Sequence, residues 1–302
     1  MENDKHMKYA YYPGCSSEST ARDQYMSIRE VSKVLGIELI EPKGWTCCGS
    51  TPAHHTDRNL SIALPAANLL LAKKMGLDMV VFCAACYNRM KVANYEIQTN
   101  PKIRKEISDS LGEDYDGSVE VHHFVEVLVK DIGIKKLQES FTHSLNGLKV
   151  VNYYGCLLVR PHAATNFDDP ENPMMMDGLV TIMGGESIDW PHKVECCGGG
   201  FALTRTDIVI ELSSSILGMA KAAGAQCMAV ACPMCQVNLD LRQSDINKTK
   251  NTNYDIPIVY ITQLVGLCLG ISPEKLGMDK CVVSPKPIIE AVISNEQRKI
   301  YS

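Results

Sequence analysis

The stretch MVVFCAAC at residues 79–86 returns as MAVACPMC at residues 228–235, with its apolar run and both cysteines in place. Four consecutive apolar residues suit a buried strand and are too few for a helix. In both copies the run leads directly into a Cys-x-x-Cys pair, and the second pair contains Pro233, a residue favoured in the first turn of a helix. We therefore predict a strand–loop–helix unit that occurs twice.

The other cysteines follow the same repeat. The Cys-Cys-Gly motifs that begin at Cys47 and Cys196 have the same separation as the Cys-x-x-Cys pairs (196 − 47 = 149 and 232 − 83 = 149). Cys15 and Cys156 are closer (156 − 15 = 141), so the second copy has eight extra residues (149 − 141 = 8), which we assign to residues 168–178. The two sets of five are Cys15, Cys47, Cys48, Cys83 and Cys86, and Cys156, Cys196, Cys197, Cys232 and Cys235.

Apolar runs of strand length alternate with stretches of helical spacing along both halves. Strands are expected at residues 9–12, 119–122, 150–154 and 256–260, and helices at residues 20–35, 60–74 and 208–223. Ser19 is the expected cap of the first of these helices. Around the first cysteine of each half, YPGC at residues 12–15 is paired with YGC at residues 154–156.

This alternation of strands and helices favours parallel sheets covered by helices. We predict an α/β fold of two tandem repeated Rossmann-like domains with mainly parallel sheets, related by pseudo-twofold symmetry. The first domain is expected at residues 1–142 and the second at residues 143–271, joined by a linker at 140–145. A polar C-terminal tail is expected at residues 272–302.

Composition limits the classes of function. A net charge of -5 without a basic block argues against nucleic acid as a principal partner. The polar segment from Met1 to Lys8 does not resemble a secretion signal, and the apolar stretch at residues 60–72 is interrupted by Pro65. We therefore expect a cytoplasmic protein without a transmembrane segment. In a reducing cytoplasm, thirteen cysteines favour metal ligands or redox groups over disulfides.

The predicted fold gathers these cysteines. In α/β sheets, functional groups lie in the loops at the carboxyl ends of the strands. Cys15 and Cys156 follow the first strand of their halves, and each Cys-x-x-Cys pair follows a later strand and begins a helix. The free N–H groups and positive potential of a helix N-terminus stabilise thiolate and bound sulfide. We therefore expect five sulfurs to converge in each half.

Three kinds of site are compatible with these sulfurs: buried structural cysteine, tetrahedral zinc and an iron–sulfur cluster. Buried structural cysteine does not explain the repeated spacing. Two thiolates about 4 Å apart repel by roughly 4 kcal/mol at an effective dielectric constant of about 20, so five need a highly charged metal core. Zinc or a cubane cluster leaves one thiol over, and adjacent residues such as Cys47 and Cys48 point apart in extended chain. We therefore favour a cluster with one thiolate more than a cubane needs.

Further features are less specific. Gly198, Gly199 and Gly200 allow close approach of the backbone to a cofactor and are candidates for cofactor binding, although an ordinary turn explains them as well. Cys227, Cys268 and Cys281 have no partners in the repeat and are interpreted as ordinary thiols. The chain has no ferredoxin-type cysteine run, no GxGxxG fingerprint and no P-loop. A redox enzyme of this kind needs a partner subunit that supplies electrons.

The two motifs, Cys-x31-Cys-Cys-x34-Cys-x-x-Cys and Cys-x39-Cys-Cys-x34-Cys-x-x-Cys, resemble those of the B subunit of heterodisulfide reductase from methane-forming archaea. The resemblance covers nearly the whole chain and all ten cysteines of the family motif. The motif also occurs in iron–sulfur subunits of glycolate and lactate oxidation and of thiol-driven fumarate reduction. The family resembled is that of the CCG, or cysteine-rich, domains.

The resemblance implies two noncubane [4Fe-4S] clusters, one held by each set of five cysteines. It implies that the disulfide of coenzyme M and coenzyme B, a substrate of methanogenesis, is cleaved between them to two thiols. It further implies electrons from a ferredoxin-like C subunit and a flavin-bearing A subunit, in an electron-bifurcating complex with a hydrogenase or formate dehydrogenase upstream. The substrate's sulfonate and phosphate would need cations, for which the candidates are Arg22, His54, His55, Arg160, His162, Lys193 and Arg205.

Two other functions remain open from the sequence. One is an electron-relay iron–sulfur subunit of a hydroxyacid (glycolate or lactate) or thiol:fumarate oxidoreductase complex. The other is a zinc-stabilised scaffold protein. Two complete motifs without a fused ferredoxin segment favour the disulfide reductase over the relay, and iron and sulfide analysis distinguishes both from the zinc protein.

Overall fold

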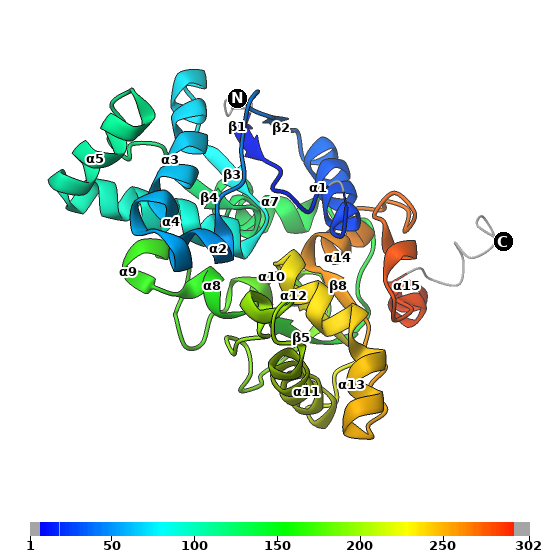
Figure 1. Ribbon diagram of the computed structural model, residues 1–302. Helices are drawn as coiled ribbons and strands as arrows, with labels where there is room; N and C mark the ends of the chain where they lie inside the picture. The colour runs from blue at the N-terminus through cyan, green and yellow to red at the C-terminus, as the bar shows by residue number, and fades with distance from the viewer. Residues whose placement is uncertain (1–6, 18, 293–302) are drawn as a thin grey trace.

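The structure is a computed structural model that describes residues 7–17 and 19–292, apart from the side chains of Thr51 and His54. Each half of the chain forms one four-stranded sheet with helices around it, and the two halves lie one above the other (Figure 1). The strand pairings within the described residues are parallel in both sheets. The predicted α/β fold of two similar parts with parallel sheets is confirmed.

The first sheet has the strand order β2-β1-β3-β4. Its strands are β1 (Met7–Tyr12), β2 (Ile37–Ile40), β3 (Met79–Val81) and β4 (Val121–His123). The helices of this half are α1 (Arg22–Val34), α2 (Ser50–Thr56), α3 (Arg58–Met75), α4 (Ala84–Thr99), α5 (Pro101–Leu111), α6 (Phe124–Glu126), the π-helix η1 (Val127–Gly133) and α7 (Ile134–Glu139). In Figure 1, α1 lies on one side of the sheet and α3 on the other.

The second sheet repeats this order as β6-β5-β7-β8. Its strands are β5 (Lys149–Tyr153), β6 (Glu186–Ile188), β7 (Cys227–Val230) and β8 (Ile258–Tyr260). The helices are α8 (Cys156–Val159), α9 (His162–Thr165), α10 (Met175–Ile182), the 3-10 turn η2 (Gly199–Phe201), α11 (Thr206–Ala222), α12 (Pro233–Gln236), the π-helix η3 (Val237–Leu241), α13 (Gln243–Lys250), α14 (Ile261–Cys268), the 3-10 turn η4 (Met278–Lys280) and α15 (Lys286–Val292).

The strand order places the ends of the strands where a site can form. In each sheet the chain moves to one side from the first strand and then crosses back over it, so the order reverses between β1 and β3 and between β5 and β7. Loops that leave adjacent strands in opposite directions open a crevice at the carboxyl ends of those strands. β3 and β7 are fully buried, and they carry the Cys-x-x-Cys pairs to this crevice.

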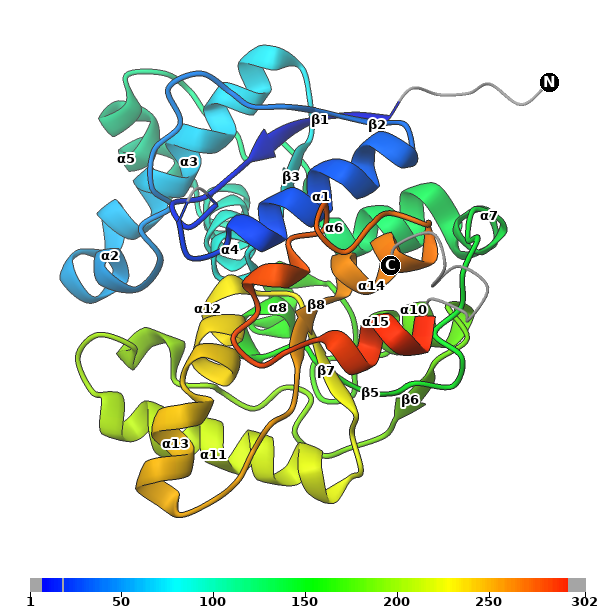
Figure 2. The same cartoon turned by 90° about the vertical axis from the view of Figure 1, so that its right-hand side faces the viewer.

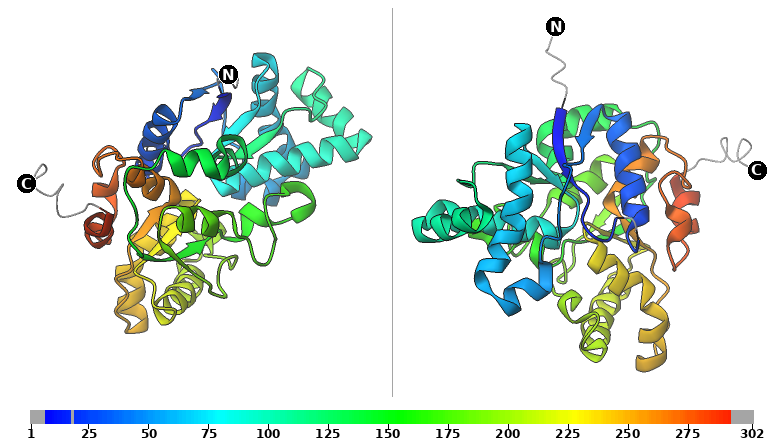
Figure 3. Two further views of the ribbon diagram at one scale, coloured as in Figure 1. Left: turned by 180° about the vertical axis from the view of Figure 1, so that it is seen from behind. Right: turned by 45° about the horizontal axis from the view of Figure 1, so that its top comes forward.

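Helices from one half pack against helices of the other in an arrangement that the pseudo-twofold relation explains. α1 packs against α14 (Figure 2), and α6 packs against α10 at the corresponding position. The Ser27 and Thr262 hydroxyls hydrogen bond across the first of these contacts at 2.7 Å. The view from behind in Figure 3 shows the same two stacked parts. The two halves therefore share one continuous apolar core.

Two local predictions differ from the structure. Helix α1 begins at Arg22 after Ala21, which makes no side-chain cap, while Ser19 instead donates to the Ser16 carbonyl at 3.4 Å; the predicted cap is wrong. The segment expected to be a polar tail buries Leu276 and Ile288 through residue 292, because its apolar side chains pack near α14. Residues 293–302 of that predicted tail lie outside the described residues.

Strand composition accounts for the cores of both sheets. β3 reads Met-Val-Val and β7 reads Cys-Met-Ala-Val, and a continuous apolar run is typical of a parallel strand covered on both faces.

α3 is the longest helix of the described residues and contains Pro65. Across the described residues, none of the helices combines the length and the apolar character that crossing a membrane requires.

Candidate metal centre

The cysteines of each half lie near the carboxyl ends of the strands, in loops and in the first turns of helices. Cys15 follows β1, and Cys156 begins α8 directly after β5. Cys83 is the N-cap residue of α4 and Cys232 that of α12, whose first position is Pro233. The predicted placement of each Cys-x-x-Cys pair between a strand and a helix is therefore confirmed, with its helix N-terminus directed at the loop.

Thiols of the first set lie in contact beside Tyr12. The Cys48 and Cys86 sulfurs are 3.2 Å apart, and the Gly49 N–H donates to the Cys47 sulfur at 3.4 Å. Burial, and then the neighbouring sulfurs of Cys86, Cys48, Cys47 and Cys15, hold the pKa of the Tyr12 hydroxyl far above its usual value. Four of the five cysteines in the first set therefore surround one tyrosine.

The second set repeats this arrangement around Tyr153. The Cys197 and Cys235 sulfurs are 3.7 Å apart, and the Gly198 N–H donates to the Cys196 sulfur at 3.3 Å. Burial and then the four sulfurs of Cys235, Cys197, Cys156 and Cys196 raise the pKa of Tyr153. These contacts correspond one to one with those of the first half.

The same geometry corrects the pairing of YPGC with YGC. The Tyr12 hydroxyl donates to the Thr46 carbonyl at 2.9 Å, and the Tyr153 hydroxyl donates to the Glu195 carbonyl at 2.6 Å. Both carbonyls belong to the residue before the Cys-Cys pair. The equivalent of Tyr12 is therefore Tyr153, and the pairing with Tyr154 is wrong. Tyr12 and Tyr153 both stand three residues before the first cysteine of their half, so the two segments align without a gap.

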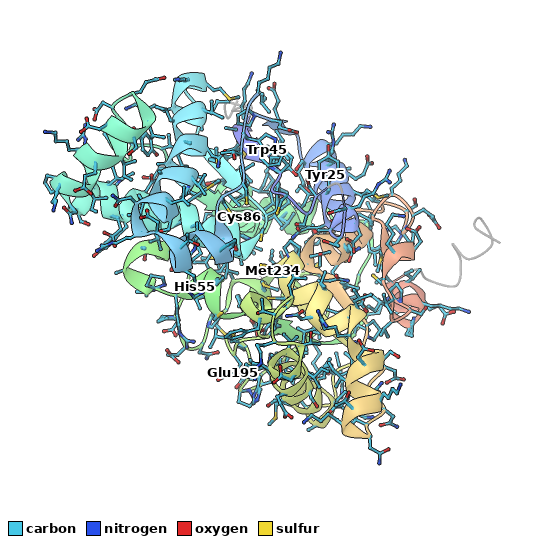
Figure 4. The ribbon with its side chains drawn as sticks, viewed as in Figure 1. Tyr25, Trp45, His55, Cys86, Glu195 and Met234 are labelled. Carbon is cyan, nitrogen blue, oxygen red and sulfur yellow. The ribbon has the colours of Figure 1, made fainter. Side chains whose placement is uncertain are left out.

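The two sets of thiols meet where the halves meet. The Cys83 thiol of the first half interacts with the Cys232 thiol of the second half. Each is the first cysteine of its Cys-x-x-Cys pair. This contact joins two groups that the sequence separates by more than a hundred residues. The ten cysteines therefore form one region with two symmetric parts, and Figure 4 shows Cys86 and Met234 in the middle of the molecule.

A buried histidine holds the two pairs together. The Nε2 atom of His123 lies 3.2 Å from the Phe82 carbonyl and 3.1 Å from the Ala231 carbonyl, which directly precede Cys83 and Cys232. The Nδ1 atom accepts the Val125 N–H at 3.3 Å, which places the ring proton on Nε2. Burial lowers the pKa of His123, so the neutral ring bridges two carbonyls of opposite halves.

Neighbouring thiols share protons unequally. Hydrogen bonds from Cys47 and Cys86 lower the pKa of Cys48 to about 3, and hydrogen bonds from Cys235 and Cys83 lower that of Cys232. The same contacts, together with burial, raise the pKa of Cys86. Thiols this close cannot all ionise without a cation to offset their repulsion.

The donor set suits iron and sulfide. All thirteen cysteines are free thiols, and ten of them are divided equally between two matching positions. Within the described residues, no three His, Cys, Asp or Glu side chains are arranged to hold a single metal ion. Iron–sulfur clusters are held by cysteine thiolates, so the chemistry of these residues fits such a group.

A cavity of about 260 Å³ opens over the second set. Residues of both halves line it, and His55 from α2 lies at the boundary in Figure 4. The lining residues are Ser50, His55, Ala84, Ala85, Arg89, Tyr153, Tyr154, Gly155, Cys156, Leu157, Cys196, Cys197, Gly199, Gly200, Phe201, Cys232, Met234 and Cys235. A small molecule in this space touches the thiol region directly.

A model of the cysteine-rich domain family matches the chain twice, at residues 9–91 and 150–240. Each match contains one full set of five cysteines. The chain belongs to the cysteine-rich CCG domain family. Both halves are members of that family, in agreement with the repeated sheet order and the repeated thiol contacts.

Several curated relatives match almost the whole chain. The B subunit of the ferredoxin:CoB-CoM heterodisulfide reductase of Methanosarcina mazei is 32% identical over 286 residues, which cover 91% of this chain and 94% of the relative. A protein of Archaeoglobus profundus that is named as similar to the B subunit of heterodisulfide reductase is 30% identical, covering 96% and 100%. The 8-methylmenaquinol:fumarate reductase membrane anchor subunit of Wolinella succinogenes is also 30% identical, covering 91% and 97%.

The fold of this CCG protein also occurs among solved structures. A hypothetical protein from Helicobacter pylori superposes with a TM-score of 0.75 at 12% sequence identity. The match covers 92% of this chain, which spans about half (52%) of the other chain. At this identity the likeness supports the fold alone.

The structure divides the remaining candidate residues of the CCG protein into two groups. His55, Gly199 and Gly200 line the cysteine cavity. Gly198 lies just before them with a φ of 78°, and a Cβ there would lie 3.2 Å from the Val209 Cα, so its role is to allow the turn. The His54 side chain lies outside the described residues.

The other cationic candidates of the CCG protein lie elsewhere. Arg160 pairs with Glu171 at 2.8 Å, and Arg205 pairs with Asp207 at 2.7 Å. His162 is exposed at the start of α9. The remaining two lie apart from the cysteine cavity: Lys193 is buried in an ion pair with Asp177, and Arg22 lines a separate cavity near the start of α1.

Sequence reasoning missed Arg89, a cation of α4 that lines the cysteine cavity. Its position corresponds to Asn238 in the second CCG domain (238 − 89 = 149). Because most of the motif residues repeat in kind, a change from arginine to asparagine at this position was the available signal.

The cavity that contains Arg22 gives a pH-dependent prediction. Burial, more than the nearby Asp240 carboxyl, raises the pKa of Asp23 from 3.8 to about 6. The folded protein therefore keeps a proton that the unfolded chain loses, so this contribution to stability is present below pH 3.8 and is lost as the pH rises to about 6. We expect Asp23→Asn to stabilise the protein by roughly 1–3 kcal/mol at pH 8 and by much less at pH 4.5.

Urea unfolding of the anaerobic protein at several pH values measures this difference. Asp255→Asn, at an exposed position, is the control and is expected to change the free energy of unfolding by less than about 0.5 kcal/mol at each pH. An Asp23→Asn variant with the same gain at pH 4.5 and pH 8 would contradict the assignment.

Proposed function

We propose that this protein is the catalytic subunit of a heterodisulfide reductase, which reduces the coenzyme M–coenzyme B disulfide to two thiols. The observation that carries the proposal is a cavity over the second set of thiols that residues of both halves line, at the place where His123 links the two Cys-x-x-Cys loops. Relatives that are named for the B subunit of heterodisulfide reductase and match nearly the full chain support it.

Each CCG domain would hold one noncubane [4Fe-4S] cluster through its five cysteines. The ligands would be Cys15, Cys47, Cys48, Cys83 and Cys86 in the first domain, and Cys156, Cys196, Cys197, Cys232 and Cys235 in the second. Bound iron–sulfur clusters supply electrons one at a time. The chain contributes low-pKa thiols such as Cys48 and Cys232, which are suited to bind metal as thiolates.

Disulfide reduction explains the need for two matched sets. The reaction takes up two electrons and two protons, breaks one S–S bond and releases two thiols. Leu157, Met234 and Phe201 give the cavity an apolar wall against which the carbon chain of a substrate packs. Tyr153 lies both in the cavity and among the four second-set sulfurs, so it connects the substrate space with the thiol region.

The electrons would come from partner subunits. We propose a ferredoxin-like C subunit as the direct donor and a flavin-bearing A subunit before it, within a complex that extends to a hydrogenase or formate dehydrogenase and bifurcates electrons. The named relatives are subunits of larger assemblies, which supports a complex. Thirteen free thiols suit the reducing cytoplasm, where we place the protein.

An anaerobic assay with reduced methyl viologen as donor tests the proposal. The holoprotein is expected to oxidise the dye when given the coenzyme M–coenzyme B disulfide and to form two thiols for each pair of electrons consumed. Iron and inorganic sulfide must both be present in the purified protein. Zinc without sulfide, or no turnover of any disulfide, would reject the proposed function.

A second candidate function is an electron-relay subunit of a hydroxyacid or thiol:fumarate oxidoreductase. The similarity to the Wolinella succinogenes protein favours it specifically, because that relative covers as much of the chain as the reductase subunits do. A relay protein would accept and return electrons without consuming a disulfide. Reversible reduction of the clusters combined with failure of the viologen assay would favour this function.

A further inference from the structure

We infer that Arg89 binds an anionic group on one arm of the disulfide substrate and thereby sets its orientation in the cavity. The inference rests on the proposed function and adds a specificity residue that the cysteine motifs do not contain. The substrate class is a disulfide in which a short aliphatic arm ends in a sulfonate or carboxylate.

Arg89 reaches the cavity from the opposite half of the molecule. It belongs to α4, the helix that begins at the first Cys-x-x-Cys pair, and it lies three residues after Cys86 on a neighbouring part of the helix surface. The cavity that it lines is built mainly around the second set, including Cys196 and Cys235. A group bound to Arg89 therefore sits between the two halves, close to where their thiols meet.

The Arg89 guanidinium makes no ion pair with any acidic side chain that the structure describes. Among the described residues that line the cavity, Arg89 is the only lysine or arginine, and none is aspartate or glutamate. Its Nη2 atom donates to the Asn88 side-chain oxygen at 2.8 Å, and the Asn88 amide donates in turn to the Leu157 and Arg160 carbonyls at 2.9 and 2.6 Å. This chain of bonds fixes the arginine in place and leaves donors for a ligand.

Partial burial of the Arg89 guanidinium without an acidic partner costs solvation free energy. Desolvation lowers the pKa of Arg89, and the charge of Cys48 opposes this effect. Arg89 is half-buried, so its guanidinium has lost part of its hydration, and an anion or strong acceptor in the cavity offsets that loss. A sulfonate or carboxylate offers oxygens that match the planar fork of an arginine, and the resulting bonds are among the strongest in proteins.

The repeat shows that this cation is not part of the general motif. At the equivalent position in the second half, Asn238 donates to the Cys197 carbonyl at 3.1 Å and lies 3.7 Å from the Cys197 sulfur. Its short amide therefore serves its own set of cysteines. Arg89 instead lines the cavity over the second set, and its counterpart Asn238 is uncharged, so the charge distribution around an otherwise symmetric region is one-sided and distinguishes the two arms of a disulfide.

Two matched disulfides test the inference in the complete protein. Bis(2-sulfoethyl) disulfide carries sulfonates, and bis(2-hydroxyethyl) disulfide has the same chain with neutral ends. In Arg89→Gln, the ratio of kcat/KM for the charged over the neutral disulfide is expected to fall by about 10- to 100-fold relative to the unchanged protein. Arg104→Gln, on α5 in an exposed pair with Asp114, is the control and is expected to preserve the ratio.

Binding of the product provides a readout that does not depend on turnover. Calorimetry with 2-mercaptoethanesulfonate is expected to show binding to the unchanged holoprotein and to Arg104→Gln, and a loss of at least about 10-fold in affinity in Arg89→Gln. Iron content, sulfide content and the electron paramagnetic resonance spectrum of the clusters are recorded for each variant. These signals separate loss of substrate binding from damage to the thiol region.

Three outcomes would overturn the inference. They are equal loss of both disulfides in Arg89→Gln, a shift in cluster potential with the charged-to-neutral ratio unchanged, and absence of sulfonate binding to the unchanged protein. The second outcome would assign Arg89 to charge balance with the thiolates. If neither disulfide is reduced while 2-mercaptoethanesulfonate still binds through Arg89, the proposed function fails and the anion site stands.

Discussion

Replacement of Cys197 with alanine is expected to abolish disulfide reduction and to remove one of the two cluster signals. Cys197 is buried, lies 3.7 Å from the Cys235 sulfur and accepts a further contact from Asn238. Removing its sulfur leaves the second set one thiolate short, while the first set keeps all five. Turnover requires both sets, so loss of one is expected to stop the two-electron reaction rather than halve its rate.

Iron and sulfide analysis together with low-temperature electron paramagnetic resonance measures this effect. The content of both elements is expected to fall by about half, since the two sites are equal in number of ligands. Cys227→Ala is the matched control, because Cys227 is a buried cysteine of β7 in the same half without a partner in the repeat. Full activity with an unchanged spectrum in Cys197→Ala would refute the ligand assignment.

The second large effect is expected from Lys193→Ala, which should destabilise the folded protein by about 3–5 kcal/mol. The Lys193 ammonium lies 3.1 Å from the Asp177 carboxylate, and their side chains are 3% and 5% exposed. Lys193 also donates to Asn172 at 2.9 Å, which ties the loop before α10 to the strand ends of the second sheet. Removing the cation leaves a buried carboxylate without its partner.

Urea unfolding of the anaerobic protein measures the loss, and two further variants define its cause. Lys193→Met combined with Asp177→Asn removes both charges. The asparagine keeps one acceptor oxygen for the Tyr154 or the Ser187 hydroxyl and can donate to the other, so the double variant is expected to recover most of the stability. Arg205→Ala breaks an exposed pair and should cost less than about 1 kcal/mol. A Lys193→Ala cost as small as that of Arg205→Ala would show that the buried pair does not hold this loop.

Most of the architecture could be predicted because it is recorded in local patterns. Short apolar runs such as residues 79–82 favour buried strands, and Cys-x-x-Cys with Pro233 favours the start of a helix. The equal spacing of the two copies specified the duplication without any contact information. The errors were also local: the Ser19 cap failed because the first turns were irregular, and Tyr154 was matched by residue type rather than by position.

The candidate cations show where local patterns fail. Seven were selected by their nearness to the motifs in the sequence, yet Lys193 is used in a buried ion pair and Arg160 in a surface pair. Arg89 was overlooked although it follows Cys86 by three residues. The direction in which a long side chain extends depends on the surface packed against its helix, which the sequence near it does not specify.

The sequence by itself determined the class of fold, the duplication and the ten cysteines, because these follow from periodicity and spacing within each half. Only the tertiary structure decided that Cys83 meets Cys232, that His123 bridges the Phe82 and Ala231 carbonyls, and that Arg89 lines the cavity of the opposite half. These relations join residues from different halves, and they depend on how two folded surfaces pack together, a property that no spacing along the chain encodes.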